Sequence, residues 1–419
     1  MSFGTISVIG LGYIGLPTAA MFASKNIKVI GVDVNQYVVD TINKAKIHIV
    51  EPDLDTIVSS SVKEGWLKAT TKPEPADAFI IAVPTPFRES KSNIPEPDLK
   101  YIKAVSKAIS PLLKKGDLVI LESTSPVGTT EKLLKWLAKE RADLVFPEST
   151  SHYCDVNVAY CPERVLPGKV VRELVENDRV IGGITEACSQ KALELYKNFV
   201  QGECVITDAR TAEMSKLTEN ACRDVQIAFA NELSIICDKL DIDVWRLISL
   251  ANRHPRINIL QPGPGVGGHC IAVDPWFIAS KTPDEAKLIR TARHINDTKP
   301  LWVIDKVKLA VSDYLQKNIS KKIKDVTIAC YGVAFKPDID DLRESPALLI
   351  AEKIAEFHLG RTIVVEPNIK TLPSHTKLEL ISFDDANIEA HIHVLLVGHS
   401  CFSKEKLKNL NLVNIVSLG

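Results

Sequence analysis

The 419-residue chain lacks an excess of charge of either sign, because 51 Lys and Arg residues stand against 52 Asp and Glu residues. Proteins that bind nucleic acids or membrane surfaces usually carry a clear basic surplus, so both partners are disfavoured. Low-complexity segments and short repeats are also missing, and 45% apolar with 25% charged residues is ordinary for a globular protein. We therefore expect about two to four globular domains, at roughly 100 to 200 residues each, and no nucleic-acid partner.

Paired cysteines are missing as well. Nine cysteines, an odd number, are scattered from Cys154 to Cys401, and no two of them form a C-x-x-C pair. This pattern fits neither a disulfide framework nor a structural zinc site. We expect no bound metal and a reducing, cytoplasmic setting.

No stretch is a good candidate for a membrane span. The first charged residue is Lys25, so residues 3–23 could be mistaken for a signal or spanning segment. They lack a basic leading region, and Gly10, Gly12 and Gly15 together with Pro17 interrupt the apolar run. We therefore expect a protein without membrane insertion.

Short apolar runs alternate with helical patterns in the first half of the chain. Such alternation is typical of parallel sheets covered by helices on both faces. Helices are expected up to Phe22, over 98–113 and from Val127 onward, and the expected strands are 6–10, 28–34, 78–84, 118–122, 156–160, 179–184 and 204–206.

Two long helical patterns follow, over 211–240 and 285–315, and the second should be broken at Pro300. Further strands are expected at 326–333, 362–365 and 393–397. We predict an α/β fold in which two Rossmann-like parallel-sheet domains are joined by a helical domain with a long central helix. The predicted boundaries are 1–207, 208–318 and 319–419, and the apolar faces of the long helices favour a homodimer.

Three glycines directly follow the first expected strand, in the motif G-L-G-Y-I-G. Gly10 allows a tight turn, Gly12 lets a pyrophosphate approach the backbone, and Gly15 lets the helix pack on the strand. Asp33, 18 residues after Gly15, is placed to accept hydrogen bonds from an adenosine ribose and would repel a 2′-phosphate. The pattern predicts a site for NAD rather than NADP.

Two threonines follow expected strands of the same sheet. Ligands of open α/β sheets bind outside the carboxyl ends of the strands, so Thr85 and Thr124 are placed to meet the nicotinamide half of the cofactor. Turn and N-cap roles explain both residues equally well.

A glycine-rich run that starts at Gly263 ends at Cys270. Such a run lets backbone crowd a ligand, and a thiol there could be an activated nucleophile with Asp274 as a nearby carboxylate. The alternative is a small buried side chain, which is the usual role of an unpaired cysteine. We expect that ordinary packing role for the other eight cysteines.

One face of the first long helix carries four polar residues at spacings of three, four and three: Glu213, Lys216, Asn220 and Arg223. At ~100° per residue they fall within an arc of roughly 80°. The next loop adds Arg253, His254 and Arg256. Together they indicate an anionic, hydroxyl-rich ligand, although a solvated charged face is the common alternative.

Charged residues also follow the strand that ends near Phe335. Lys336, Asp341 and Arg343 could close a phosphate-bearing site from the last domain, or be no more than turn charges.

These motifs together resemble the UDP-glucose dehydrogenase superfamily, whose members oxidise a UDP-hexose to a UDP-hexuronic acid with two NAD. The resemblance covers essentially the whole chain. Residues 263–277, G-P-G-V-G-G-H-C-I-A-V-D-P-W-F, and the His254-Pro-Arg256 triplet are more similar to the N-acetylhexosamine branch than to the glucose branch. The resemblance implies C6 oxidation of UDP-N-acetyl-D-mannosamine, for enterobacterial common antigen or a related surface polysaccharide. UDP-N-acetylglucosamine and UDP-glucose remain alternative substrates.

The resemblance also implies roles for single residues. It makes Cys270 the nucleophile and Lys216 the proton donor or acceptor. Besides Lys216, the implied substrate contacts are Arg164, Val165, Asn220, Arg223, His254, Arg256, Gly267, Phe335 and Lys336. Besides the three glycines, the implied cofactor contacts are Tyr13, Ile14, Asp33, Thr85, Thr130 and Arg343. The segment Tyr160-Cys-Pro-Glu163-Arg departs from the Asn-Pro-Glu-Phe pattern of the glucose branch, which leaves the part of Glu163 in hydrolysis open.

Chemistry explains why one site would need both a thiol and a cation. The C6 hydroxyl would lose its proton toward Lys216 or a water, and Cys270 would capture the resulting aldehyde. A second oxidation would leave a thioester that water cleaves to the acid. Lys216 and Asn220 would stabilise the oxyanions, and the water could be oriented by Asp274, Glu163 or Thr124.

Two other functions share part of this pattern. A single-step hydroxy-acid or phosphogluconate-type dehydrogenase also combines a Rossmann domain, a helical domain and a helix-borne lysine, and Cys270 would be inert there. An NAD-responsive binding protein would keep the pocket without chemistry, but it would have no use for the thiol and Lys216.

Overall fold

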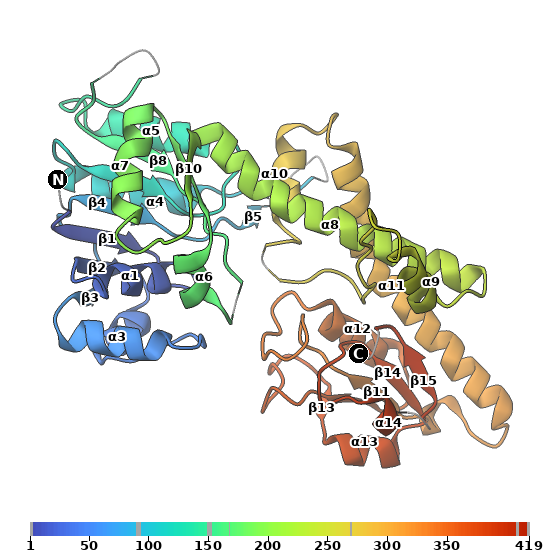
Figure 1. The fold of residues 1–419 in the computed structure, drawn as a ribbon. Coiled ribbons are helices and arrows are strands. Elements are labelled where there is room, and N and C mark those ends of the chain that lie inside the picture. The colour runs from blue at the N-terminus through green and yellow to red at the C-terminus, as the bar shows by residue number, and fades with distance from the viewer. Residues whose placement is uncertain are drawn as a thin grey trace. The chain divides into compact units, whose positions relative to one another are not determined.

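The computed structural model describes residues 3–88, 94–148, 153–166, 168–268, 270–407 and 410–416 (Figure 1). The chain divides into two compact units. The first comprises Met1–Glu219 and Trp276–Thr282, and the second comprises Asn220–Pro275 and Pro283–Gly419.

The first unit is built on a parallel sheet, which has eight strands within the described residues, in the order β10-β9-β8-β7-β4-β1-β2-β3. Neighbouring strands pair in parallel except β8 with β9. The strands are β1 Thr5–Ile9, β2 Lys28–Val32, β3 Leu67–Thr70, β4 Ala78–Ile81, β7 Leu118–Leu121, β8 Asn157–Tyr160, β9 Arg179–Gly183 and β10 Cys204–Asp208.

Helices cover both faces of this sheet. Along β4, Ala78 and Ile80 belong to one apolar cluster, and Phe79 and Ile81 belong to the cluster on the opposite face. Burial on both faces explains why the strand is apolar at every position. The helices are α1 Gly15–Ala23, α2 Gln36–Asn43, α3 Leu54–Lys63, α4 Lys100–Ile109 with the 3-10 turn η1 Ser110–Leu112, α5 Thr129–Glu140, α6 Val170–Glu176 and α7 Glu186–Tyr196, and a short hairpin pairs β5 Phe87–Arg88 with β6 Glu96–Pro97.

The second unit contains a smaller parallel sheet, with the order β13-β12-β11-β14-β15 among the described residues. Its strands are β11 Ile328–Tyr331, β12 Thr362–Val365, β13 Glu379–Leu380, β14 Ile392–Leu395 and β15 Leu412–Asn414. The shorter helices of the second unit are α9 Val244–Ala251, α12 Pro346–Phe357, α13 Phe383–Glu389, α14 Lys404–Leu407 and the 3-10 turn η2 Ile323–Asp325. Helix α10 Asp274–Lys281 belongs to the first unit from Trp276 onward.

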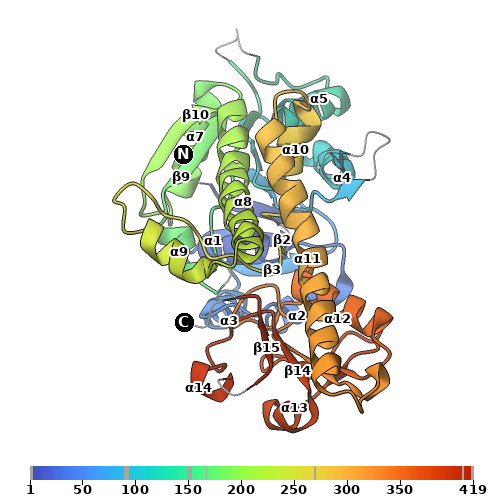
Figure 2. The same ribbon diagram turned by 90° about the vertical axis from the view of Figure 1, so that its right-hand side faces the viewer.

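Two helices of 31 residues, α8 Ala209–Lys239 and α11 Lys287–Lys317, dominate the middle of the chain. The expected break at Pro300 is wrong, because α11 continues through it as one helix (Figure 2). Proline removes one helical donor and disfavours the preceding turn. Contacts with α8 outweigh that penalty, since Arg293 and Asn296, in the two turns before Pro300, both bond to Asp224 of α8.

The predicted fold class is confirmed. Two parallel-sheet domains of Rossmann type and a long central helix are present, and the strongest apolar runs became the central strands. Among the described residues, no helix combines the length and the apolarity needed to cross a membrane.

Candidate active site

The turn between β1 and α1 requires glycine at two positions. Gly10 has a φ of +93°, and a Cβ atom on Gly15 would lie 1.7 Å from the carbonyl oxygen of Gly10. A Cβ atom on Gly12, by contrast, would meet nothing within 4 Å. The turn is therefore closed toward the protein and open at Gly12, where the start of α1 offers N–H groups to an anion.

Asp33 follows β2 and lies beside this turn. Its Oδ2 accepts a 3.0 Å hydrogen bond from the N–H of Leu11, and its Oδ1 accepts a 2.9 Å bond from the N–H of Asn35. Each oxygen keeps a further lone pair for a ribose hydroxyl. Tyr13, 36% exposed, and the half-buried Ile14 complete the turn. These residues fit a bound dinucleotide with an unphosphorylated ribose.

The structure brings together the two threonines predicted at the carboxyl edge of the sheet. The hydroxyl of Thr85, after β4, donates a 2.6 Å hydrogen bond to the carbonyl of Thr124, after β7. The bond ties the two loops at the point where the nicotinamide half of the cofactor was expected.

Thr130 has a strong structural partner in the same unit. Its N–H and hydroxyl both donate 2.7 Å hydrogen bonds to Oε1 of Glu213, and the N–H of Gly128 donates a 2.6 Å bond to Oε2. Burial raises the pKa of Glu213, although these donors oppose the shift. Glu213 thus caps the start of α5, and its fully buried carboxylate is bonded there instead of facing the ligand that we expected on this side of α8.

Glu163 lies in a buried charge network that the sequence did not reveal. Arg179 donates from Nη2 to Oε2 of Glu163 at 2.6 Å and from Nη1 to Oε1 of Glu122 at 3.2 Å. Glu122 also accepts hydrogen bonds from Thr18 on α1 and Tyr196 on α7. Burial raises the pKa of Glu122, against the opposing charge of Arg179. One guanidinium therefore serves two carboxylates.

The two residues that follow Glu163 also have contacts within the first unit. The N–H of Arg164 donates a 2.8 Å hydrogen bond to Oε1 of Glu163, and its guanidinium pairs with Glu219 at 2.8 Å. Val165 packs against the apolar cluster of the first sheet. Lys216, three residues before Glu219 on α8, is half-buried.

In the second unit, Asn220 and Asp274 meet beside Cys270. The Asn220 amide donates a 2.5 Å hydrogen bond to Oδ2 of Asp274, which is 2% exposed. The N–H of Asp274 in turn donates a 2.9 Å bond to the carbonyl of Cys270. Cys270 is exposed on this turn. Three of the predicted catalytic residues thus form one local group.

The glycine run before Cys270 packs against the segment that follows β11. A Cβ atom on Gly267 would lie 2.4 Å from the carbonyl oxygen of Glu344, and one on Gly268, whose φ is +79°, would lie 3.3 Å from the Phe335 ring. No larger residue fits at Gly267 without displacing backbone. The predicted substrate contacts Gly267 and Phe335 therefore lie together, with Lys336 half-buried beside them.

A buried polar network between α8 and α11 holds the start of the same glycine run. The N–H of Gly263 donates a 2.9 Å hydrogen bond to Oδ1 of Asn231, whose amide donates to Asn296. Asn296 and Arg293 both donate to Oδ1 of Asp224, at 2.8 and 2.6 Å. Sequence reasoning missed this network because its members come from helices far apart in the chain.

The remaining predicted contacts lie at the surface. Arg223, His254 and Arg256 are exposed, and Arg343 is exposed and pairs with Asp341 at 2.6 Å. Within the part of the chain that the structure describes, no group of three or more His, Cys, Asp or Glu residues could hold a metal ion.

The expectation for the eight remaining cysteines is only partly correct. Four of them, Cys161, Cys188, Cys237 and Cys330, are buried, and Cys154 and Cys204 are half-buried. Cys222 and Cys401 are exposed, so the predicted packing role as a buried side chain is wrong for these two.

Comparison with known proteins places this geometry in context. Models of the UDP-glucose/GDP-mannose dehydrogenase family match residues 4–200 as its NAD binding domain, 210–298 as its central domain and 329–415 as its UDP binding domain. The UDP-N-acetyl-D-mannosamine dehydrogenase of Escherichia coli strain K12 is 62% identical over 404 residues, which cover 96% of this chain and 95% of that protein.

Two further proteins extend the comparison. The NDP-N-acetyl-D-galactosaminuronic acid dehydrogenase of Ralstonia solanacearum is 60% identical over 405 residues, covering 96% of this chain and 93% of that protein. A solved UDP-D-ManNAc dehydrogenase from Pyrococcus horikoshii superposes with a TM-score of 0.85 at 36% identity, covering 99% of this chain and 95% of that one.

Proposed function

The chain belongs to the UDP-glucose/GDP-mannose dehydrogenase family, and from this premise we propose that it oxidises UDP-N-acetyl-D-mannosamine at C6 to UDP-N-acetyl-D-mannosaminuronate. It is an NAD-dependent oxidoreductase that acts on a nucleotide sugar. The 62% identity to the Escherichia coli enzyme supports the choice of mannosamine. The Ralstonia relative, at 60% identity, carries another N-acetylhexosamine in its name, so the galactosamine derivative is included in the substrate test below.

One observation carries the chemical part of the proposal. Cys270 is exposed on a turn whose carbonyl is bonded by the N–H of Asp274, and the buried carboxylate of Asp274 holds the Asn220 amide. Covalent capture of an aldehyde needs a thiol nucleophile and a donor for the new oxyanion, and Cys270 and Asn220 are proposed to supply them. A single-step dehydrogenase would have no use for the thiol.

The cofactor would be held by the open turn of Gly10, Gly12, Tyr13, Ile14 and Gly15, with Asp33 at the ribose. Thr85, Thr124, Thr130 and Arg343 are the further proposed contacts. Bound NAD supplies a hydride acceptor in each of the two oxidations. The protein's part is to orient the dinucleotide, and the Thr85–Thr124 bond supports that role by fixing the two loops expected at the nicotinamide.

The first step needs a proton acceptor for the C6 hydroxyl, and Lys216 is proposed for it. The thiolate of Cys270 then attacks the aldehyde carbon, forming an S–C bond while Lys216 and Asn220 stabilise the new oxyanion. After the second oxidation, a water attacks the resulting thioester, the S–C bond breaks, and the thiolate is restored as the acid forms. Asp274, Glu163 or Thr124 would orient that water.

Substrate binding is assigned in the same way to Arg164, Val165, Arg223, His254, Arg256, Gly267, Phe335 and Lys336. The packing of Gly267 against the segment that carries Phe335 supports this for the second unit. We further propose the three-domain division at 1–207, 208–318 and 319–419, a cytoplasmic location, and a part in the synthesis of enterobacterial common antigen or a related polysaccharide.

A homodimer through the long helices is also proposed. Four large apolar side chains on α8 and α11 are between 45% and 61% exposed: Phe229, Ile236, Leu301 and Leu309. Apolar area of this kind favours a subunit interface. Light scattering after gel filtration should give twice the mass of the 46.2 kDa chain, and a monomer at working concentrations would refute the proposal.

The substrate is tested by following NADH formation with purified protein and four UDP-linked N-acetyl or neutral sugars: N-acetylmannosamine, N-acetylglucosamine, N-acetylgalactosamine and glucose. We expect the highest kcat/KM with the mannosamine derivative. A preference for another of these sugars would correct the substrate and keep the reaction class. No NADH from any of them would refute the proposed activity.

A further inference from the structure

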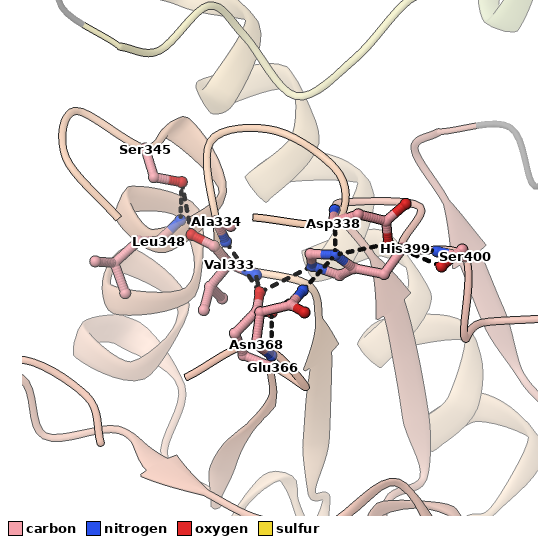
Figure 3. Close-up of polar contacts among 9 residues, drawn as sticks. All are labelled: Val333, Ala334, Asp338, Ser345, Leu348, Glu366, Asn368, His399 and Ser400. Atoms are coloured by element: carbon pink, nitrogen blue, oxygen red, sulfur yellow. Dashed lines mark hydrogen bonds and ion pairs between the residues drawn. The ribbon is translucent and has the colours of Figure 1, made fainter. Parts of the chain in front are cut away.

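A buried histidine and glutamate pair lies at the carboxyl edge of the smaller parallel sheet (Figure 3). Glu366 follows β12 and His399 follows β14, so they flank the segment 333–338 that leaves the neighbouring strand β11. Nε2 of His399 lies 2.9 Å from Oε2 of Glu366, and both side chains are 0% exposed. Neither side chain can reach a ligand directly.

Glu366 anchors the beginning of the 333–338 segment. Its Oε2 accepts hydrogen bonds from the N–H groups of Val333 and Ala334 at 2.8 and 3.0 Å. Its Oε1 accepts two more from Asn368, and Ser345 donates a 2.7 Å bond to the carbonyl of Val333. Burial opposes ionisation of Glu366, but the donors from His399 and Val333 outweigh it and lower its pKa.

His399 anchors the far end of the same segment. Its Nδ1 accepts a 2.9 Å hydrogen bond from the N–H of Asp338, which has a φ of +61°. A ring nitrogen that accepts a hydrogen bond carries no proton, so the proton of the neutral ring is on Nε2, which donates to Glu366. Oδ1 of Asp338 also accepts from the N–H and hydroxyl of Ser400.

The two anchors enclose Phe335 and Lys336. Phe335 is also the ring against which Gly268 packs, and Gly267 contacts the same segment through the Cβ of Phe335. The conformation of residues 333–338 therefore determines where these two side chains lie. It also determines where the glycine run before Cys270 finds its support.

We propose that Glu366 and His399 are positioning residues, which hold residues 333–338 in the shape that presents Phe335 and Lys336 to the nucleotide sugar. This inference rests on the proposed function, because it takes Phe335 and Lys336 as substrate contacts. The pair acts as one relay of hydrogen bonds, from Asp338 through the His399 ring to Glu366 and on to Val333 and Ala334. Removing either side chain by substitution would free one end of the segment and would not alter the NAD-binding domain.

The test uses full-length His399→Ala and His399→Asn. Alanine removes both anchoring bonds of the ring, whereas an asparagine amide can still place an oxygen near Nδ1 and accept from Asp338. We expect the KM for the UDP-sugar and the calorimetric Kd for UDP to rise about tenfold or more in His399→Ala, and less in His399→Asn. The KM for NAD should rise clearly less than the KM for the UDP-sugar, because most proposed cofactor contacts lie in the first unit, and Arg343 is the only proposed cofactor contact near this segment.

His393→Ala is the matched control. His393 is a second buried histidine of the same sheet, 3% exposed, and its Nδ1 lies 2.9 Å from the Tyr331 hydroxyl instead of bonding to residues 333–338. It should lower the Tm without changing the KM for the UDP-sugar. If the histidine variants do not fold, Glu366→Gln is tested in their place. Glutamine keeps one side-chain oxygen that can accept from the N–H groups of Val333 and Ala334.

Three results would overturn the inference: unchanged UDP affinity in folded His399→Ala, an equal rise in the KM for NAD, or an equal loss of UDP affinity in His393→Ala. Wild-type protein that binds no UDP would instead refute the proposed function. The wild-type measurement therefore separates failure of the proposed function from failure of the positioning role.

Discussion

The amide of Asn220 donates a 2.5 Å hydrogen bond to the carboxylate of Asp274, and this bond joins the long helix α8 to the turn that carries Cys270. A carboxylate only accepts, so the bond fixes which way the amide faces: its nitrogen is toward Asp274 and its oxygen is away from it. Asp274 is 2% exposed, so water competes little for the bond. The amide is thus oriented before substrate binds.

A double-mutant cycle tests this relationship. Asn220→Ala and Asp274→Ala should each lower kcat by about 100-fold, because the first removes the amide donor and the second removes the acceptor that orients it. The double variant should lose little more than the worse single variant. Gln226→Ala, on an exposed position of α8, is the control and should keep the wild-type kcat. Fully additive losses would show that the two residues act independently.

The two glycines of the cofactor turn should separate folding from binding. A Cβ atom at position 15 would lie 1.7 Å from the carbonyl oxygen of Gly10, so Gly15→Ala should lower the Tm by about 5 °C or more. A Cβ atom at position 12 meets nothing within 4 Å of protein. Gly12→Ala should therefore keep the Tm and raise the KM for NAD. Equal Tm losses in both variants would contradict the open geometry at Gly12.

Asp33 should determine both cofactor affinity and cofactor choice. Asp33→Ser removes the two carboxylate oxygens that accept hydrogen bonds, and with them the charge that repels a 2′-phosphate. The KM for NAD should therefore rise about tenfold or more, and the preference for NAD over NADP should shrink. Asp40→Ser is the control, since Asp40 is an exposed acid on α2 that bonds to Gln36. An unchanged ratio of kcat/KM for the two cofactors would exclude a ribose contact.

Lys299 should make stability depend on pH. Its ammonium donates to Ser234 and lies 3.7 Å from the centre of the Trp302 ring, and burial lowers its pKa from 10.5 to about 7. A lysine whose pKa is lower in the folded state destabilises the fold fully below pH 7, and this penalty fades as the pH rises from about 7 toward 10.5. Lys299→Met should therefore raise the Tm most near pH 7, with a smaller gain at pH 9.

The control for this prediction is Lys306→Met. Lys306 lies two turns further along α11, is 32% exposed and pairs with Asp238 at 2.6 Å, so it has no comparable burial penalty. Its replacement should give no gain in Tm at pH 7. A gain from Lys299→Met that did not change between pH 7 and pH 9 would mean that burial does not suppress its charge.

Local sequence patterns predicted those structural features that depend on residues close together in the chain. β4 and β7 are apolar at every position because both faces are buried, and the G-L-G-Y-I-G turn follows from contacts within a few residues. The group of Asn220, Asp274 and Cys270 was predicted by residue chemistry and resemblance, and its hydrogen bonds came only with the structure.

Pairings over long distances in the chain could not be predicted. Arg179 lies 57 residues from Glu122, Glu213 lies 83 residues from Thr130, and Arg293 lies 69 residues from Asp224. No sequence periodicity links such positions. An acidic residue that follows an apolar run indicates only that the strand ends there, and it does not indicate which residue will pair with it. The break predicted at Pro300 failed for the same reason, because contacts with α8 outweighed a local preference.

The central claim is that one active site performs both oxidations through a thioester on Cys270. Counting NADH formed per UDP-sugar consumed, with sugar limiting and NAD in excess, tests it most directly. The account predicts about two NADH per sugar for the wild type, and a stall after the first oxidation for Cys270→Ser. A ratio of about one in the wild type, or complete uronate formation by Cys270→Ser, would contradict it.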